Sequence, residues 1–206
     1  MAEGRANAPV ARRSNVRGEA TRARLLAAAL DTFAVQGYHG TGTRDIADEA
    51  GISQAAMFVH YSTKEDLLFQ LAVDGHRTIV EIVREAAARK GTAAEKLSAV
   101  VRDHSRYHAQ FQKQARVVNF EIGALTREHR EEISRYRREL ESIVRGILIE
   151  GVQSGDFRVV DLPMTALALL SLGFDVCRWY REDGIWTIEE IGDRYQEMAL
   201  RIVGCS

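Results

Sequence analysis

The sequence has few of the residues on which other kinds of fold depend. Cys177 and Cys205 are the only cysteines in 206 residues, too few and too scattered for a disulfide framework or a cysteine zinc site. The chain also has only two prolines and almost no runs in which β-branched and polar residues alternate, so strands are not expected. These absences predict an all-α protein.

Long apolar runs and catalytic signatures are lacking as well. No stretch reaches the roughly 18 apolar residues of a membrane span, and the N-terminus has no apolar signal segment, so we expect a soluble, cytoplasmic protein. A net charge of −1 excludes a general polyanion binder. There is no Gly-rich phosphate loop, no G-x-S-x-G turn and no recognisable pair of carboxylates, so neither an enzyme nor a cofactor is expected.

Positive charge is nevertheless concentrated at the start of the chain. Residues 1–24 contain six arginines, at positions 5, 12, 13, 17, 22 and 24, against Glu3 and Glu19. An Arg-rich arm suits contact with phosphates or the minor groove of DNA, and a solvated disordered tail is the alternative for residues 1 to about 15. Residues 1–18 are therefore expected to form a basic, disordered arm.

Residues 41–67 have the pattern of two short helices joined by a sharp turn. Thr43 is the expected N-cap of the first helix, whose apolar residues fall three to four positions apart on one face. Gly51 follows, where a tight turn often needs positive φ. Ser53 is placed to cap a second helix of about seven residues, with Met57 turned inward. The pattern is typical of a helix-turn-helix, whose second helix reads the DNA major groove.

The same stretch resembles the DNA-binding signature of TetR-family regulators. The residues that carry the resemblance are Thr43-Arg44-Asp45-Ile46-Ala47, Ala50-Gly51-Ile52-Ser53, His60, Lys64-Glu65 and Leu67. Two positions depart from the family: Ala55 stands where Gly is usual, and Phe58 where Tyr is usual. The family Tyr commonly gives its hydroxyl to a phosphate, whereas Phe58 can only pack on sugar or on a thymine methyl.

The candidate DNA contacts combine polar, basic and small side chains. The amides after Thr43 form a helix N-terminus that can hold a phosphate, and Arg44 can reach a phosphate or a guanine edge. Gln54 is suited to pairing with adenine, and the small residues beside it permit close approach to thymine methyls. The resemblance places Lys64 beside the DNA backbone. The full set is Thr43, Arg44, Ser53, Gln54, Ala55, Ala56, Phe58, Val59, His60 and Lys64.

Apolar periodicity predicts further helices, for an all-α fold of about nine helices. Their expected ranges are 19–36, 64–89, 94–115, 129–152, 162–182 and 187–203. Residues 19–65 are expected to form a helix-turn-helix DNA-binding domain, and residues 66–206 a connector helix followed by an effector-binding and dimerisation domain. The helix over 64–89 would span about 35 Å, long enough to carry movement to the DNA-binding residues.

Two histidines, His104 and His108, fall on the inward stripe of the helix over 94–115. Each can be a satisfied core residue, for example one bonded to Glu121. They can instead line an apolar pocket with a few polar groups, as small-molecule sites have. At a spacing of i, i+4 they could also bind a metal, but no third ligand is suitably spaced and no metal is expected.

The segment Arg178-Trp179-Tyr180 resembles the effector-domain ending of TetR-like repressors of fatty-acid and steroid breakdown. That resemblance implies an acyl-CoA or a similar thioester as the inducer. The aromatic pair can equally be plain core or interface residues. The candidate ligand-binding residues are His104, Tyr107, His108, Phe111, Phe120, Glu121, Arg178 and Trp179.

The last two predicted helices carry more apolar surface than one small domain can cover. Residues 164–174 are apolar nearly all round, and residues 188–202 have a seam with steps of three and four. We expect a homodimer formed through a four-helix bundle, as the family resemblance also implies. The candidate interface residues are Leu167, Leu170, Phe174, Ile188, Ile191, Tyr195, Met198 and Ile202.

Together these features predict a homodimeric transcriptional repressor that binds an inverted-repeat operator and is released by a small-molecule effector, on the family's pattern an acyl-CoA. Three alternatives remain: an activator, an effector-independent DNA-binding or architectural protein, and an enzyme with a helix-turn-helix-like domain. A second domain packed without any cavity would favour the effector-independent protein, because an effector needs a pocket.

Overall fold

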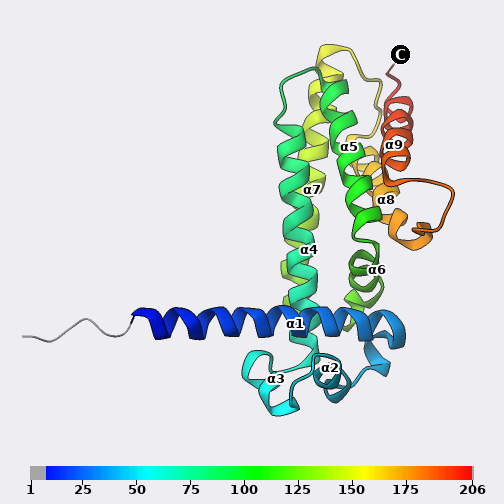
Figure 1. The fold of residues 1–206 in the computed structure, drawn as a ribbon. Helices are drawn as coiled ribbons and strands as arrows, with labels where there is room; N and C mark the ends of the chain where they lie inside the picture. Colours follow the sequence, from blue (N-terminus) through cyan, green and yellow to red (C-terminus); the bar gives the residue numbers. More distant parts are fainter. Residues whose placement is uncertain (1–7, 206) are drawn as a thin grey trace, which may run out of the picture. The chain divides into compact units, whose positions relative to one another are not determined.

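The chain folds as an all-α protein, as its composition predicts. The computed structural model describes the backbone of residues 8–205 and the side chains of residues 18–205. The described residues form nine α-helices and one 3-10 helix, with no strand among them (Figure 1). They divide into two compact units, with the boundary between Leu71 and Ala72, inside the fourth helix.

The first unit begins with α1 (Ala8–Gly40). This helix starts earlier than the predicted residue 19, because alanine and arginine, both good helix formers, recur before that point. Of the predicted disordered arm, residues 1–7 lie outside the described residues, and the backbone of residues 8–18 is helical. At Gly37, one residue after the predicted range, the backbone leaves helical geometry (φ 73°, ψ 164°).

Helices α2 (Thr43–Glu49) and α3 (Gln54–His60) form the predicted helix-turn-helix. Their inward side chains, among them Ile46 and Met57, are fully buried. Gly51 has the positive φ of 64° that the turn needs. The predicted cap of α3 is confirmed, since Ser53 Oγ accepts a hydrogen bond from Ala56 N at 3.2 Å. The predicted cap of α2 is wrong: Gly42 is the N-cap.

Helix α4 (Lys64–Ala87) runs through the boundary between the units. Its start is fixed by a reciprocal pair of hydrogen bonds between Thr63 and Asp66. Asp66 N donates to Thr63 Oγ1 at 3.1 Å, and Thr63 N donates to Asp66 Oδ2 at 2.8 Å. Thr63 thereby caps α4.

The second unit continues through five further helices and a 3-10 turn, and each long helix has a side-chain cap. Thr92, Thr126, Asp161 and Thr187 cap α5, α7, α8 and α9. In Figure 1, α4, α5 and α7 run side by side, and α5 packs against α7, α8 and α9 around one apolar core. The elements are α5 (Ala93–Gln110), α6 (Gln112–Glu121), η1 (Ile122–Ala124), α7 (Arg127–Ser154), α8 (Leu162–Trp179) and α9 (Ile188–Ile202).

The helix predicted over 94–115 is broken at Phe111. That residue has φ −105° and ψ 36°, so α5 ends at Gln110 and α6 begins at Gln112. The change of direction takes Phe111 off the inward stripe and leaves 41% of it exposed. Periodicity alone continues across the break, because apolar residues follow on both sides.

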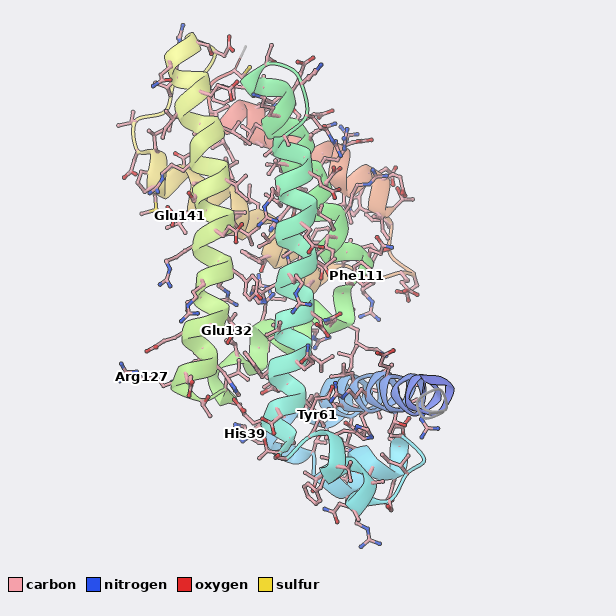
Figure 2. All side chains as sticks on the ribbon, turned by 90° about the vertical axis from the view of Figure 1, so that its left-hand side faces the viewer. His39, Tyr61, Phe111, Arg127, Glu132 and Glu141 are labelled. Atoms are coloured by element: carbon pink, nitrogen blue, oxygen red, sulfur yellow. The ribbon has the colours of Figure 1, made fainter. Side chains whose placement is uncertain are left out.

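The surfaces of α7 and α8 differ in character. Charged side chains, including Arg127, Glu132 and Glu141, line much of α7 (Figure 2). Among the described helices, α8 is the one whose length and mean hydropathy of 1.2 would suit a membrane span. One face of α8 is buried in the core of its own unit, as expected of a core helix.

Candidate nucleic-acid interface and ligand cavity

The outer face of α3 is exposed and carries no acidic residue. Val59 is 80% exposed and Phe58 47%, while Met57 on the opposite face is completely buried and anchors the helix. Such a face, with a buried anchor behind it, is what a major-groove reading helix requires. Of the predicted DNA contacts, Arg44, Ser53, Gln54, Ala55, Phe58 and Val59 are exposed, and Thr43, Ala56, His60 and Lys64 are half-buried.

The starts of α2 and α3 are tied together by one hydrogen bond. Gln54 Nε2 donates to Thr43 Oγ1 at 2.7 Å. This bond orients the Gln54 amide, the group that we expect to pair with adenine. Arg44 pairs with Asp48 at 3.8 Å, but both side chains are more than 70% exposed. Such a pair is weak in water, so the guanidinium can exchange Asp48 for a phosphate.

Lys64 has a role that the sequence did not reveal. Its Nζ donates to the backbone carbonyls of Tyr38 and Thr41, both at 2.7 Å, and lies 4.4 Å from the centre of the Tyr38 ring. The ammonium, at the start of α4, therefore holds the end of α1 and the residues that follow it. Sequence reasoning missed this because backbone carbonyls leave no signature in the sequence. A phosphate contact by Lys64 stays a prediction.

Replacing Lys64 with alanine is expected to lower the free energy of unfolding by about 2 kcal/mol. The change removes two charge-assisted hydrogen bonds, one from the carbonyl of Tyr38 and one from that of Thr41. Urea unfolding followed by circular dichroism measures the effect. The matched control is Lys90→Ala, on an exposed lysine in the turn after α4. Equal stability of the two variants would contradict a structural role for Lys64.

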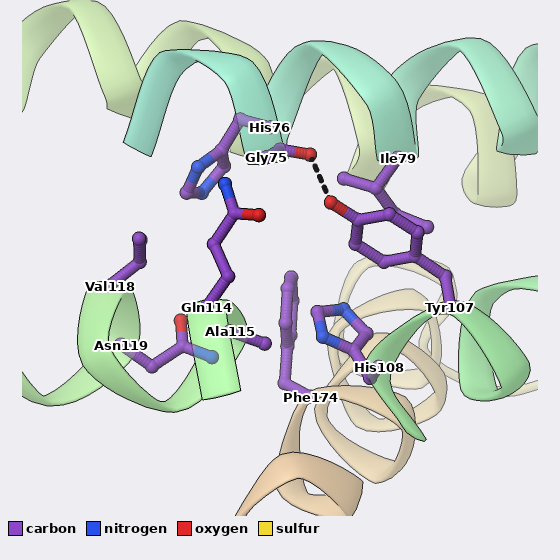
Figure 3. A pocket seen from close by; sticks show the side chains of 10 residues that line it. All are labelled: Gly75, His76, Ile79, Tyr107, His108, Gln114, Ala115, Val118, Asn119 and Phe174. Atoms are coloured by element: carbon purple, nitrogen blue, oxygen red, sulfur yellow. Dashed lines mark hydrogen bonds between the residues drawn. The ribbon is translucent and has the colours of Figure 1, made fainter. Parts of the chain in front are cut away.

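A cavity lies within the second unit, between α4, α5, α6 and α8 (Figure 3). Its empty space, including open solvent at its mouth, is about 320 Å³. The wall is mostly apolar. One hydrogen bond joins two of the lining residues: the Tyr107 hydroxyl donates to Gly75 O at 3.0 Å. The lining residues are Gly75, His76, Ile79, Tyr107, His108, Gln114, Ala115, Val118, Asn119 and Phe174.

One wall of this cavity is held by Arg137 on α7. Its Nε donates to His76 Nε2 and its Nη2 to Asn119 Oδ1, both at 3.3 Å. Because His76 Nε2 accepts, Nδ1 carries the proton and donates to Ala72 O at 2.8 Å. Burial, and then the nearby Arg137, lower the pKa of His76 to about 4, and burial also lowers the pKa of Arg137. Sequence reasoning missed His76 and Arg137 as site residues, because both come from helix faces that looked ordinary.

The two predicted histidines of α5 occupy different environments. His108 lines the cavity, whereas His104 is packed against Phe174, with ring centroids 5.0 Å apart, and does not line it. Burial lowers the pKa of His104 to about 4, and burial with the neighbouring His104 lowers the pKa of His108 well below its usual value. Both rings are therefore neutral near pH 7. Among the described residues, no three His, Cys, Asp or Glu side chains converge as metal ligands.

These lowered pKa values predict that acid destabilises the protein. A buried histidine stays neutral in the folded state, while the unfolded chain takes up a proton at about pH 6.5. For His104 the resulting loss in the free energy of unfolding grows as the pH falls from 6.5 to 4 and reaches about 3 kcal/mol. Urea unfolding at pH 7 and pH 5 is expected to show a smaller acid effect in His104→Leu than in the wild type. Equal acid effects would contradict the burial of His104 as a neutral ring.

A second, more open cavity adjoins the first and shares Asn119 and Phe174 with it. Its empty space is about 510 Å³, including open solvent. Arg178 lies on its rim and pairs with Asp175 at 2.9 Å. The lining residues are Asn119, Phe120, Ser171, Phe174, Asp175, Cys177 and Arg178.

Four of the eight predicted ligand residues line a cavity. Tyr107 and His108 line the first, and Phe120 and Arg178 the second. The remaining four line neither: His104, Phe111, Glu121 and Trp179. His104 is covered by α8, Phe111 sits at the helix break, Glu121 ends α6, and the Trp179 indole hydrogen-bonds Tyr195 of α9.

The predicted dimer residues separate into inward and outward sets. Leu170 and Ile191 are 5% and 3% exposed within their own unit, and so cannot face a partner. Phe174, Ile188 and Tyr195 are half-buried against the core. The exposed members are Leu167, Met198 and Ile202, joined by Met164, which the sequence analysis did not select.

Comparison with known proteins decides the family. A family model described as bacterial regulatory proteins, tetR family, matches residues 25–71, and one described as tetracyclin repressor-like, C-terminal domain, matches residues 90–203. The chain belongs to the TetR family. This confirms the family that the helix-turn-helix residues indicated.

Two curated relatives and two solved structures illustrate the likeness of this TetR-family chain. The fatty acid metabolism regulator protein of Bacillus subtilis is 31% identical over 65% of this chain and 69% of its own. The transcriptional repressor KstR2 of Rhodococcus jostii is 26% identical over 87% and 89%. A tetR-family regulatory protein from Rhodococcus RHA1 has a TM-score of 0.86 and 36% identity over 90% and 98%. FadR from Bacillus subtilis, solved in complex with stearoyl-CoA, has a TM-score of 0.71 and 26% identity over 86% and 96%.

Proposed function

We propose that this TetR-family chain is a cytoplasmic transcriptional repressor that binds an inverted-repeat operator as a homodimer and is released by a small-molecule effector. The observation that carries the proposal is the presence, in one chain, of an exposed α3 face without acidic residues and a lined cavity in the second unit. The naming of the KstR2 relative as a repressor supports the sign of regulation. The cavity disfavours an effector-independent protein.

In this proposal residues 19–65 bind DNA through α3. Phe58 and Val59 approach thymine methyls, and the exposed Gln54 amide pairs with adenine. Arg44 gives up its weak pairing with Asp48 to take a phosphate. Each protomer would read one half-site, so the operator is an inverted repeat.

The dimer is proposed to form through the outer faces of α8 and α9, within residues 66–206. Exposed apolar side chains on these faces, including Leu167, Met198 and Ile202, would be covered by the same faces of a second copy. Such an isologous contact gives the two-fold axis that an inverted repeat requires.

The proposed effector is an acyl-CoA thioester. FadR has been solved with stearoyl-CoA, and the B. subtilis relative regulates fatty acid metabolism by its name. The apolar cavity of this chain suits an acyl group, and the adjoining, more open cavity with Arg178 on its rim suits the polar part of such a molecule.

Release of the operator would follow from a shift in the populations of two conformers of the protein. Three residues of α4 line the cavity: Gly75, His76 and Ile79. The first residues of the same helix belong to the unit that contains α3. A ligand that favours a conformer with the two α3 helices at the wrong separation lowers operator affinity. For a tenfold loss of operator affinity, the ligand need favour that conformer by only about 1.4 kcal/mol.

Selection of random duplex DNA on the purified protein, followed by sequencing, tests the proposal. We expect an inverted repeat to be enriched, and one thioester in a series from short to long acyl chains to release it. An inverted repeat that no thioester releases would retain the repressor and reject the acyl-CoA. No enriched sequence at low salt would reject the repressor itself.

A further inference from the structure

The imidazole of His108 lies in the wall of the first cavity without any hydrogen-bond partner. The residue is 4% exposed, and neither Nδ1 nor Nε2 has a donor or acceptor among the described residues. Figure 3 shows the ring beside the space bounded by Tyr107, Phe174 and Gly75. A buried polar group in this condition is rare in folded proteins, and each such group calls for a partner or a functional role.

The neighbours of His108 cannot supply that partner. Phe174 packs on the ring edge-to-face at a centroid distance of 4.9 Å and offers no polar atom. The hydroxyl of Tyr107 is already bonded to Gly75 O. His104 lies 4.7 Å away, centroid to centroid, but its own Nε2 is equally without a partner. The hydrogen-bonding capacity of His108 is therefore available to whatever enters the cavity.

The chemistry of the ring limits what that partner can be. Burial keeps the imidazole neutral, so it presents one N–H donor and one nitrogen acceptor. A carbonyl oxygen can accept from the N–H, and a hydroxyl can serve either nitrogen. A saturated hydrocarbon would leave both nitrogens unsatisfied and would be disfavoured for that reason.

We propose that the cavity selects a ligand with an apolar skeleton that carries a hydroxyl or carbonyl oxygen at the position facing His108. The surrounding apolar wall, which includes Ile79, Val118 and Phe174, takes the skeleton. The proposal rests on the assignment of this cavity to the effector. It narrows the effector from any acyl group to one that is oxygenated within its apolar part.

The test uses the full-length protein with isotope-labelled histidine and three probes of similar size: cyclohexanol, cyclohexanone and methylcyclohexane. We expect the two oxygenated probes to bind roughly tenfold more tightly than the hydrocarbon. They should also shift the ring-nitrogen resonances of His108 in NMR spectra, whereas methylcyclohexane should not.

Two leucine variants on α5 separate the role of His108 from a general effect on packing. In His108→Leu the preference for an oxygenated probe should disappear, and in His108→Gln, which keeps a donor and an acceptor, part of it should remain. The control is His104→Leu, a change at an equally buried histidine that does not line the cavity, and there the preference should persist.

The proposal is overturned if all three probes bind the wild type equally, if none binds, or if the preference survives in His108→Leu. Resonances that already show a bonded ring and do not respond to any probe would mean an ordered water only, which also overturns it. If His108→Leu does not fold, the wild-type affinities and resonances decide alone. No coenzyme A ester is used, so failure of the acyl-CoA titration and failure of this proposal are distinguishable.

Discussion

Replacing Val59 with glutamate is expected to abolish operator binding while leaving the fold intact. The side chain is 80% exposed on the outer face of α3, so the substitution disturbs no packing. A carboxylate placed there would face the acceptor-rich groove and the phosphates, and like charges in an interface cost several kcal/mol. We expect a loss of roughly a hundredfold or more in affinity.

Fluorescence anisotropy with the selected operator measures this loss, and circular dichroism checks the fold. The control is Val160→Glu, which places the same charge on a fully exposed valine of the second unit. That variant should bind the operator as the wild type does. If Val59→Glu bound with unchanged affinity, α3 would not be the reading helix.

The second large effect is expected from Gly173→Ala in α8. The absence of a side chain at Gly173 lets α8 approach α5 so closely that the His104 ring lies against the glycine, and an added Cβ would overlap Nδ1 of that ring. His104 is 2% exposed, so its ring is enclosed by the rest of the unit. Overpacking of this kind is expected to lower the free energy of unfolding by about 3 kcal/mol.

Gly146→Ala in α7 is the matched control, because a Cβ at that position would meet nothing within 4 Å. There the better helix propensity of alanine should raise stability by up to about 1 kcal/mol. Urea unfolding of both variants gives the comparison. The two substitutions are expected to change the free energy of unfolding in opposite directions. A stabilised Gly173→Ala variant would contradict the close approach of α5 and α8.

The parts of this fold that sequence could predict are those fixed by local chemistry. Ser53 and Thr63 cap helices because a hydroxyl and an unpaired amide lie within a few residues of each other. Gly51 marks its turn because a positive φ favours glycine. Met57 points inward because helical spacing sets its direction. These local rules were sufficient to predict the helix-turn-helix.

What sequence could not predict depends on partners far away in the chain. The break at Phe111 has no glycine or proline to mark it, and the stripe of apolar residues continues past it. In α8, which is apolar nearly all round, periodicity cannot tell that Leu170 faces its own core while Leu167 faces outward. The role of Arg137 in holding the cavity wall depends on its two acceptors, His76 and Asn119, which lie 61 and 18 residues away in the sequence.

Arg137 also constrains how this cavity can change during evolution. One guanidinium joins three helices, because it holds His76 of α4 and Asn119 of α6 from its place on α7. Substituting any one of the three would leave a buried or half-buried polar group of another without its bond, so their effects should be strongly non-additive. Descendants that acquire a different ligand preference at this wall should therefore replace these residues as a set rather than one at a time.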